Sequence, residues 1–308
     1  MMRLTTLPFV KKIWAKVRLR KILIRHQEVA TFWKPVVEEY FRGNISRYRL
    51  NPKKEDLIGK KVIWQYWGQG FTSGQLPGVV EICLASVEKH KGDYEIIRLS
   101  DNSLSDYIDL PCFVLEKRDN GVFSRTFFSD LLRLALLKAY GGVWLDATVL
   151  LTDTLTQKYS GCDYFVYQRD SDEVHKEYWE SSYAYYWGWH PKFSVKMLNS
   201  IMFAKKDSLV ISSLLDLVLH YWKTENHIID YFFFQILYEV LMTGQLAEHR
   251  CHVVSDTIPH ALQSYLNSEY NLESKEEIFR KAGLHKLSYK TIETTKLLTI
   301  IEELNSSR

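Results

Sequence analysis

Three charged side chains lie in a stretch of the sequence that is otherwise apolar. Asp130 and Arg133 are the only charged residues in the run 126–137. Asp146 is the first polar residue after the apolar run 143–145. Carboxylates bind divalent cations and basic side chains stabilise anions, so these groups together suit a charged, reacting ligand.

The elements of this stretch are predicted to bring the three groups to one crevice. Apolar residues at helical spacing predict a largely buried helix over Ser124–Tyr140, and Asp130 and Arg133, three residues apart, share one of its faces. A Gly-Gly pair ends the helix, and the short strand that follows has Asp146 at its end. In open α/β sheets, ligands bind at the carboxyl ends of the strands. The alternative is a core helix that carries a surface ion pair.

The same stretch resembles the core of sugar-nucleotide glycosyltransferases of the DXD type, which have a GT-A fold. It is similar in particular to the bacterial capsular polysaccharide synthesis proteins, which resemble glycosylating toxins and yeast mannosyltransferases. Their pattern is an Asp-x-x-Arg helix, Gly-Gly, an aromatic residue and Asp-x-Asp. It is matched here at Asp130, Arg133, Gly141, Gly142, Trp144 and Asp146. Thr148 departs from it, since the second Asp of the motif would stand there.

The resemblance implies a fold and an activity. The fold is α/β, a GT-A-like, Rossmann-type mixed sheet flanked by helices. The activity is transfer of a hexose from a nucleotide-sugar, with UDP the expected nucleotide and with retention of anomeric configuration. Asp146 is expected to be catalytic and to hold a metal ion or the ribose, while Asp130 and Arg133 bind hydroxyls of the donor sugar. The residues themselves do not assign a nucleophile.

Two tryptophans near the first predicted strand are candidates for binding the donor nucleotide. Residues 61–67 (KVIWQYW) predict a strand that runs into a Gly-Gln-Gly loop. In proteins of the resembled group, an aromatic residue near this point stacks on the nucleotide base. Trp67, next to the loop, is the first candidate and Trp64 the second. The alternative for either is a place in the core.

A His-Lys pair near the C-terminus supplies further candidates. In the segment 284–290 (LHKLSYK), the resemblance makes His285 a metal ligand beside Asp146, and Lys286 or Lys290 the contact to the diphosphate. The expected cofactor is Mn²⁺ or Mg²⁺, because hard cations prefer oxygen ligands. The threonine at position 148 leaves three alternatives, which are weaker metal binding, recruitment of Asp153, or no metal.

The second half of the chain is expected to bind the acceptor. Aromatic residues crowd the segment Tyr178–His190, which forms either a platform for an acceptor sugar or a packed cluster. Asp230 begins an Asp-Tyr-Phe element that resembles one in the capsular proteins, and it is a second catalytic candidate. Alternatively, its carboxylate stabilises the first turn of a helix over Ile228–Met242. Other predicted elements are helices over 79–88 and 209–222 and strands over 94–99, 164–168 and 199–203.

Charge is unevenly distributed along the 308 residues. The net charge is +3, yet residues 1–25 contain eight basic residues and no acidic one. This local excess argues against a protein that coats nucleic acid over its whole surface. Apolar residues interleave with the cations over Phe9–Ile24. They predict a basic helix that lies on an anionic membrane surface, or one that packs on the domain.

Two domains and a cytoplasmic location are expected. The first is a basic helical segment over 1–58, and the second is a glycosyltransferase domain over 59–308, with a nucleotide-sugar half (59–152) and an acceptor half (153–308). No uncharged apolar run of 18 residues occurs, so no transmembrane helix is expected. Four separated cysteines without a Cys-x-x-Cys motif are typical of a reducing compartment. The expected location is peripheral, on the inner face of the cell membrane.

Three functions remain open on the sequence. The first is a capsular glycosyltransferase whose partners are a nucleotide-sugar donor, a lipid-linked oligosaccharide acceptor and an anionic membrane surface, with no nucleic acid. The second is a toxin-like enzyme that glycosylates a protein. The third is a non-catalytic module that binds sugar-nucleotides or membranes, in which the threonine at position 148 marks lost chemistry.

Overall fold

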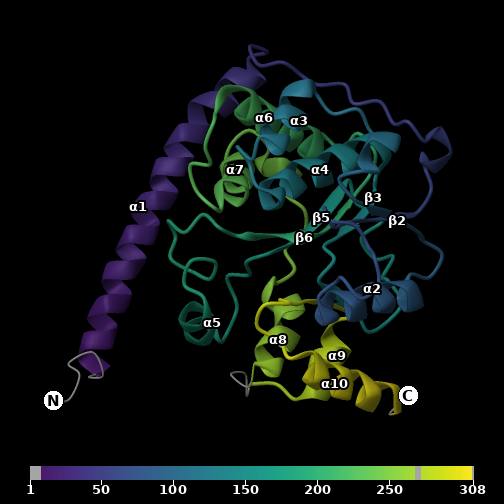
Figure 1. Ribbon diagram of the computed structural model, residues 1–308. Coiled ribbons are helices and arrows are strands. Elements are labelled where there is room, and N and C mark those ends of the chain that lie inside the picture. The colour runs from purple at the N-terminus through teal and green to yellow at the C-terminus, as the bar shows by residue number, and fades with distance from the viewer. Residues whose placement is uncertain (1–7, 268–271, 307–308) are drawn as a thin grey trace.

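A five-stranded mixed sheet forms the centre of the molecule (Figure 1). The computed structural model describes residues 8–267 and 272–306. The strands lie in the order β2 (Glu95–Leu99), β1 (Val62–Tyr66), β3 (Gly142–Leu145), β6 (Met197–Ala204) and β5 (Tyr164–Gln168). β1 pairs in parallel with β2 and β3, whereas β6 is antiparallel to β3 and β5. The predicted fold class, an α/β mixed sheet flanked by helices, is confirmed.

Helices lie on both sides of the sheet, and all five residues of β1 are buried as a result. One side holds α3 (Cys112–Asp119), α4 (Arg125–Tyr140), α6 (Leu209–Thr224) and α7 (Phe233–Met242). The other holds α2 (Gly78–His90), α8 (Thr257–Leu266), α9 (Lys275–Lys281) and α10 (Thr294–Ser306). The remaining elements are α1 (Pro8–Phe41), α5 (Lys176–Ser182), an antiparallel pair of β4 (Val149–Leu151) and β7 (Leu284–Lys286), and 3-10 turns at Glu55–Leu57, Leu104–Asp106 and Ala247–His249.

The connection from α4 to β3 depends on two glycines. Gly141 and Gly142 follow the helix directly, with φ angles of 78° and 100°. Residues with a Cβ rarely adopt this region. A Cβ on Gly142 would lie 2.5 Å from the backbone oxygen of Val62 in the neighbouring strand. The Gly-Gly pair therefore permits the close pairing of β3 with β1 where β3 begins.

The two halves of α1 have different surroundings. The helix runs from Pro8 to Phe41, well beyond the end predicted at Ile24. From Val29 onward its inward face is buried against α6 and α7, and this packing, which local sequence does not reveal, extends the helix. In Figure 1 the N-terminal half stands away from these helices. Within the described residues, none of the helices has the length and apolar character needed to span a membrane. The domain boundary at residue 58 stays a prediction.

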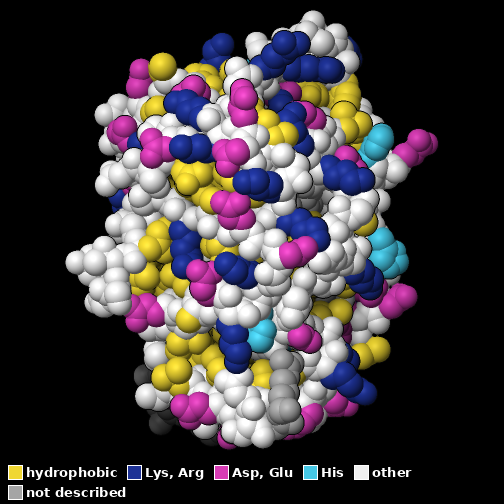
Figure 2. Space-filling view, turned by 90° about the vertical axis from the view of Figure 1, so that its right-hand side faces the viewer, with side chains coloured by type: hydrophobic (Ala, Val, Ile, Leu, Met, Phe, Trp, Pro, Cys, Tyr) yellow, Lys and Arg dark blue, Asp and Glu magenta, His cyan; other side chains and the backbone are white. Residues whose placement is uncertain are grey.

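The positive charge of the N-terminal sequence is concentrated on α1. Residues 12–25 contain six basic residues and no acidic one, and all six are exposed. By contrast, the face shown in Figure 2 carries basic and acidic side chains next to one another. Such mixed charge does not attract a polyanion strongly, whereas a helix with charge of one sign does.

The predicted strands and helices are present, most of them with shifted ends. The helix predicted from Ile228 begins instead at Phe233, so Asp230 does not lie in its first turn. The carboxylate of Asp230 accepts a hydrogen bond from the backbone N–H of Phe232 (2.8 Å). Such side-chain bonds to nearby backbone compete with helix formation, which explains the later start.

The variant Trp33→Ala is predicted to lower the free energy of unfolding by about 3–5 kcal/mol, because it removes a buried indole. Trp33 has no exposed surface, and its Nε1 donates to the backbone oxygen of Phe233 (3.0 Å). Trp14 lies on the other half of α1 and is 64% exposed. Trp14→Ala is therefore the matched control, with an expected change within about 0.5 kcal/mol. Urea denaturation measures both. Equal losses in the two variants would contradict the division of α1 into a packed and an exposed half.

Candidate active site

Asp130, Arg133 and Asp146 meet at the carboxyl end of β3. Arg133 NH2 lies 3.0 Å from Asp130 Oδ1, and its NH1 lies 3.6 Å from Asp146 Oδ1. The guanidinium lies 5.1 Å from the centre of the Trp144 ring. The structure therefore brings together the three charged groups that the sequence placed in one crevice.

Arg133 is held from several directions while only 3% of it is exposed. Its Nε donates to the backbone oxygen of Ser129 (3.0 Å), and its NH1 donates to the backbone oxygen of Asn199. A charge buried to this degree is tolerated only when its hydrogen-bonding groups are satisfied. These contacts tie α4 to β6 as well as to β3.

β6 supplies two groups that the sequence analysis missed. Asn199 Nδ2 donates to Asp130 Oδ1 (2.8 Å), and the backbone oxygen of Ser200 accepts from the Asp146 N–H (2.9 Å). Both residues interrupt the otherwise apolar strand MLNSIMFA. Two adjacent polar residues in a buried strand are the signal that would have indicated them.

The second cation of the site comes from the C-terminal strand β7. This strand pairs with β4 in a register that places Lys286 opposite Val149. Lys286 Nζ consequently lies 3.4 Å from Asp146 Oδ2 and 2.5 Å from Thr148 Oγ1. Of the three C-terminal candidates, Lys286 is the one that contacts Asp146.

His285 and Lys290 are not brought to Asp146. Adjacent residues of a strand point to opposite faces, so His285 faces away from the side that carries Lys286. It is fully buried, with Nε2 2.9 Å from Thr152 Oγ1, and burial lowers its pKa to about 3. Lys290 is exposed, and its ammonium lies 5.9 Å from the centre of the Tyr289 ring.

The groups around Asp146 do not fit a divalent cation. No three His, Cys, Asp or Glu side chains gather at a candidate metal site within residues 8–267 and 272–306. The carboxylate of Asp146 already lies between two cations and accepts a hydrogen bond from Trp144 Nε1 (2.8 Å). Asp153 lies beyond the far end of β4, against Gly283. The Lys286 ammonium contacts the side chains of residues 146 and 148, between which the Asp-x-Asp pattern would hold the metal.

Trp67 lies beside the site, whereas Trp64 belongs to the core. Trp64 is fully buried, and its Nε1 donates to the backbone oxygen of Gly141 (2.9 Å). Trp67 is partly buried and packs against the cluster that contains Ala147, the neighbour of Asp146 in the chain. Its ring also meets that of Tyr289 edge to face, with centres 5.7 Å apart.

A cavity of about 580 Å³, called here the crevice, extends from the charged groups. Both charged and aromatic side chains line it, and the aromatic ones are called here the aromatic wall. This aromatic wall consists of Trp179, Tyr183, Tyr186, Trp187, Tyr231 and Phe232. The segment predicted as a platform thus contributes four of its six residues. Asp230 does not line the crevice; its carboxylate faces α1, where Oδ2 accepts from Arg25 Nε (3.3 Å).

A buried ion pair fixes the aromatic wall in place. Arg169 Nε and NH2 each lie 3.0 Å from a carboxylate oxygen of Asp256. The guanidinium lies 4.4 Å from the centre of the Trp187 ring, and its NH2 donates to the backbone oxygen of Tyr186 (3.0 Å). The Tyr186 hydroxyl donates to the same carboxylate (2.9 Å). A bidentate pair with a stacked ring leaves the wall little freedom.

The two acids of the site differ in their electrostatics. Burial raises the pKa of Asp130 to about 6, although Arg133 partly offsets that effect. Burial acts in the same direction on Asp146, but Arg133 and Lys286, with hydrogen bonds from Trp144 and Ser200, bring the pKa of Asp146 below its ordinary value. Asp146 is therefore ionised at neutral pH, while Asp130, with a pKa of about 6, titrates close to neutral pH.

The fold and the site define a class of protein. Carboxylates and cations at the carboxyl end of β3, beside a cavity lined by aromatic side chains, suit an anionic ligand that also carries hydroxyl groups. The chain belongs to the capsular polysaccharide synthesis family, because the sequence model described as "Capsular polysaccharide synthesis protein" matches residues 14–304. The predicted membership of this family is confirmed.

No curated protein matches the sequence significantly. Among solved structures, the one titled "PaToxG Glycosyltransferase" is similar at a TM-score of 0.40 and 12% sequence identity, over 93% of this chain and 96% of that chain.

The raised pKa of Asp130 leads to a prediction about stability. The folded protein binds a proton at Asp130 more tightly than the unfolded chain does, because the pKa rises from 3.8 to about 6 on folding. Ionising Asp130 therefore destabilises the fold as the pH rises through this range. Asp130→Asn removes the titrating group. The stability of the variant relative to wild type should increase by about 2 kcal/mol between about pH 4.5 and about pH 7.5. Denaturant titrations at the two pH values measure it, and a difference that stays constant would refute the assignment.

Proposed function

We propose that this protein is a glycosyltransferase that moves a hexose from a nucleotide-sugar, with UDP the expected nucleotide, to a lipid-linked oligosaccharide in capsular polysaccharide synthesis. The observation that carries the proposal is the cluster of Arg133, Asp146 and Lys286 at the end of β3. Breaking the bond to the anomeric carbon leaves negative charge on the departing diphosphate. Cations fixed at that position stabilise the transition state more than the ground state.

The two cations have different roles in this proposal. The Lys286 side chain is 22% exposed, while that of Arg133 is 3% exposed. Lys286 therefore contacts the diphosphate directly, and Arg133 holds Asp130 and Asp146 in position. The base lies toward Trp67 and Tyr289, beyond the end of β1. The hexose then lies toward Asp130, whose carboxyl group and its partner Asn199 bind the sugar hydroxyls.

The balance of charge in the site favours an anionic donor when Asp130 is protonated. With both acids ionised, the charges of Asp130, Arg133, Asp146 and Lys286 cancel. One proton on Asp130 leaves the group with a net positive charge. An incoming diphosphate raises the pKa of a nearby carboxyl group further, so donor binding draws that proton in. The protonated acid then donates a hydrogen bond to a sugar oxygen.

The acceptor enters along the aromatic wall of the crevice. Tyrosine and tryptophan faces pack against the apolar faces of sugar rings, while their polar atoms make hydrogen bonds. Asp230 has no catalytic part in this proposal, because it faces α1 and positions Tyr231 and Phe232 instead. The anomeric configuration of the hexose is expected to be retained, because the resembled enzymes retain it. The exposed cations of α1 support a location on an anionic membrane surface at the cytoplasmic side.

The variant Lys286→Ala is predicted to weaken binding of a UDP-hexose by at least about tenfold, since it removes a charge-assisted contact to the diphosphate. Lys290→Ala is the control, because Lys290 is exposed and does not line the crevice. Calorimetric titration with a panel of UDP-hexoses measures both variants. Equal loss in the two would contradict the assignment of Lys286. Binding by wild type without transfer or hydrolysis of any donor would support a non-catalytic module instead.

Donor binding is also predicted to survive removal of divalent cations. Lys286 lies where the metal would be held, so binding of a UDP-hexose in EDTA should stay within about twofold of that in Mn²⁺. Thermal shifts with and without the nucleotide measure this, because a ligand of the native state raises the melting temperature. A shift seen in Mn²⁺ and lost in EDTA would show that a metal is required.

A further inference from the structure

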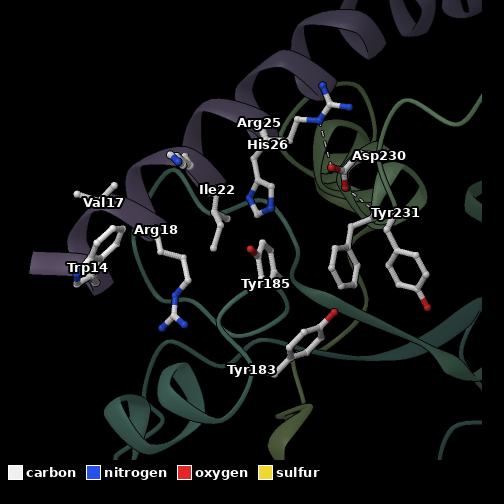
Figure 3. Close-up of a pocket in the computed structure, with 12 residues that line it drawn as sticks. Trp14, Val17, Arg18, Ile22, Arg25, His26, Tyr183, Tyr185, Asp230 and Tyr231 are labelled. Carbon is white, nitrogen blue, oxygen red and sulfur yellow. Dashed lines mark hydrogen bonds and ion pairs between the residues drawn. The ribbon is translucent and has the colours of Figure 1, made fainter. Parts of the chain in front are cut away.

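A second cavity, of about 480 Å³, lies between α1 and the aromatic wall. It is called here the α1 groove, and its lining includes Trp14, Val17, Arg18, Lys21, Tyr183 and Tyr185. Figure 3 shows Arg18 projecting from α1 into the space that the two tyrosines face. The groove differs from the crevice in that residues of α1 line only the groove.

The groove contains two cations with no acidic partner. Neither Arg18 nor Lys21 makes an ion pair within the part of the chain that the structure describes. A third cation, Arg25, is already paired, with Glu28 at 3.0 Å and Asp230 at 3.3 Å. His26 adds no charge at neutral pH, because burial lowers its pKa to about 4. Two free cations at one cavity are therefore available to an anion.

Large apolar side chains lie next to these cations. Trp14 is 64% exposed and Val17 42%, although both are apolar. Tyr185, on the opposite side, is 54% exposed. Exposed apolar groups beside free cations suit an amphiphile, with a phosphate for the cations and a hydrocarbon chain for the apolar surface.

The groove adjoins the crevice through shared residues. Tyr183, Tyr231 and Phe232 line both cavities. A ligand whose anionic group lies in the groove can therefore extend past these rings toward Asp146. This continuity selects a lipid-linked saccharide over an isolated phospholipid, because only the saccharide would use the second cavity.

We propose that the α1 groove is the subsite for the lipid phosphate of the acceptor. Arg18 and Lys21 bind the phosphate, while Trp14 and Val17 contact the first part of the lipid chain. The saccharide then passes over Tyr183 into the crevice. The inference rests on the proposed function and adds the place where the acceptor is recognised.

The chain contains a matched control for general attraction to membranes. Lys16 and Arg20 also lie on α1 and are exposed, but they line a different hollow, on the side toward His190 and Lys192. Attraction to an anionic bilayer depends mainly on the number of cations near the surface. Arg18→Ala/Lys21→Ala and Lys16→Ala/Arg20→Ala each remove one arginine and one lysine. If the groove is a subsite, the two double variants should differ in their affinity for the lipid phosphate. If binding is general attraction to cations, they should lose affinity equally.

The probe is farnesyl phosphate below its critical micelle concentration, titrated calorimetrically into the full chain. We expect binding that inorganic phosphate and farnesol do not reproduce separately. Arg18→Ala/Lys21→Ala should weaken it by at least about tenfold, while Lys16→Ala/Arg20→Ala should stay within about twofold. Trp14→Ala should weaken it as well, by loss of apolar contact.

Two results would overturn the inference. One is equal loss of farnesyl phosphate binding in both double variants, which indicates attraction to cations in general. The other is full retention in Arg18→Ala/Lys21→Ala. Binding of a UDP-hexose is measured on the same samples as a control. It should be unchanged in the double variants, because these exposed residues do not line the crevice. If the groove inference is contradicted but the variants still bind the donor, the proposed function is unaffected. If wild type does not bind any donor, the proposed function itself is contradicted.

Discussion

The buried guanidinium of Arg133 is the interaction on which the site depends. Asp130 and Asp146 come from a helix and from the end of a strand, and two carboxylates this close to a shared crevice repel each other. Arg133 lies between them and also donates to the backbone of β6. Desolvating a charge is costly, so the fold satisfies it completely, and the layer of helices is thereby held in one position against the sheet. The arrangement of the three charged groups is a result of that requirement.

A second buried arginine organises the aromatic side chains that line the crevice. Arg169 and Asp256 form a second buried pair, and it fixes a wall of aromatic side chains. The crevice is therefore lined by a charged group and an aromatic group of side chains, each held by a buried arginine. Three residues of the aromatic wall, Tyr183, Tyr231 and Phe232, also line the α1 groove. Under the proposed function, the charged groups would bind the anionic donor, and the aromatic wall and the groove would bind the saccharide and the lipid of the acceptor.

The sequence by itself determined the local unit at the centre of the site. A helix, a Gly-Gly pair and a short strand follow one another within 22 residues, from Arg125 to Asp146. The helical repeat decides that Asp130 and Arg133 share a face, and strand polarity decides that Asp146 lies at a carboxyl end. Both rules act between neighbours in the chain, which explains why the motif could be recognised from the sequence alone. The family match agrees with the resemblance that the motif indicated.

The tertiary structure alone decided which distant residues join this unit. His285 and Lys286 are adjacent and equally plausible as sequence, yet the register of β7 against β4 turns the lysine to Asp146 and the histidine into the core. Asn199 reaches Asp130 only because β6 runs antiparallel beside β3. Strand register and order are set by packing over the whole sheet, and a shift of one residue exchanges the two faces. No local pattern encodes that choice.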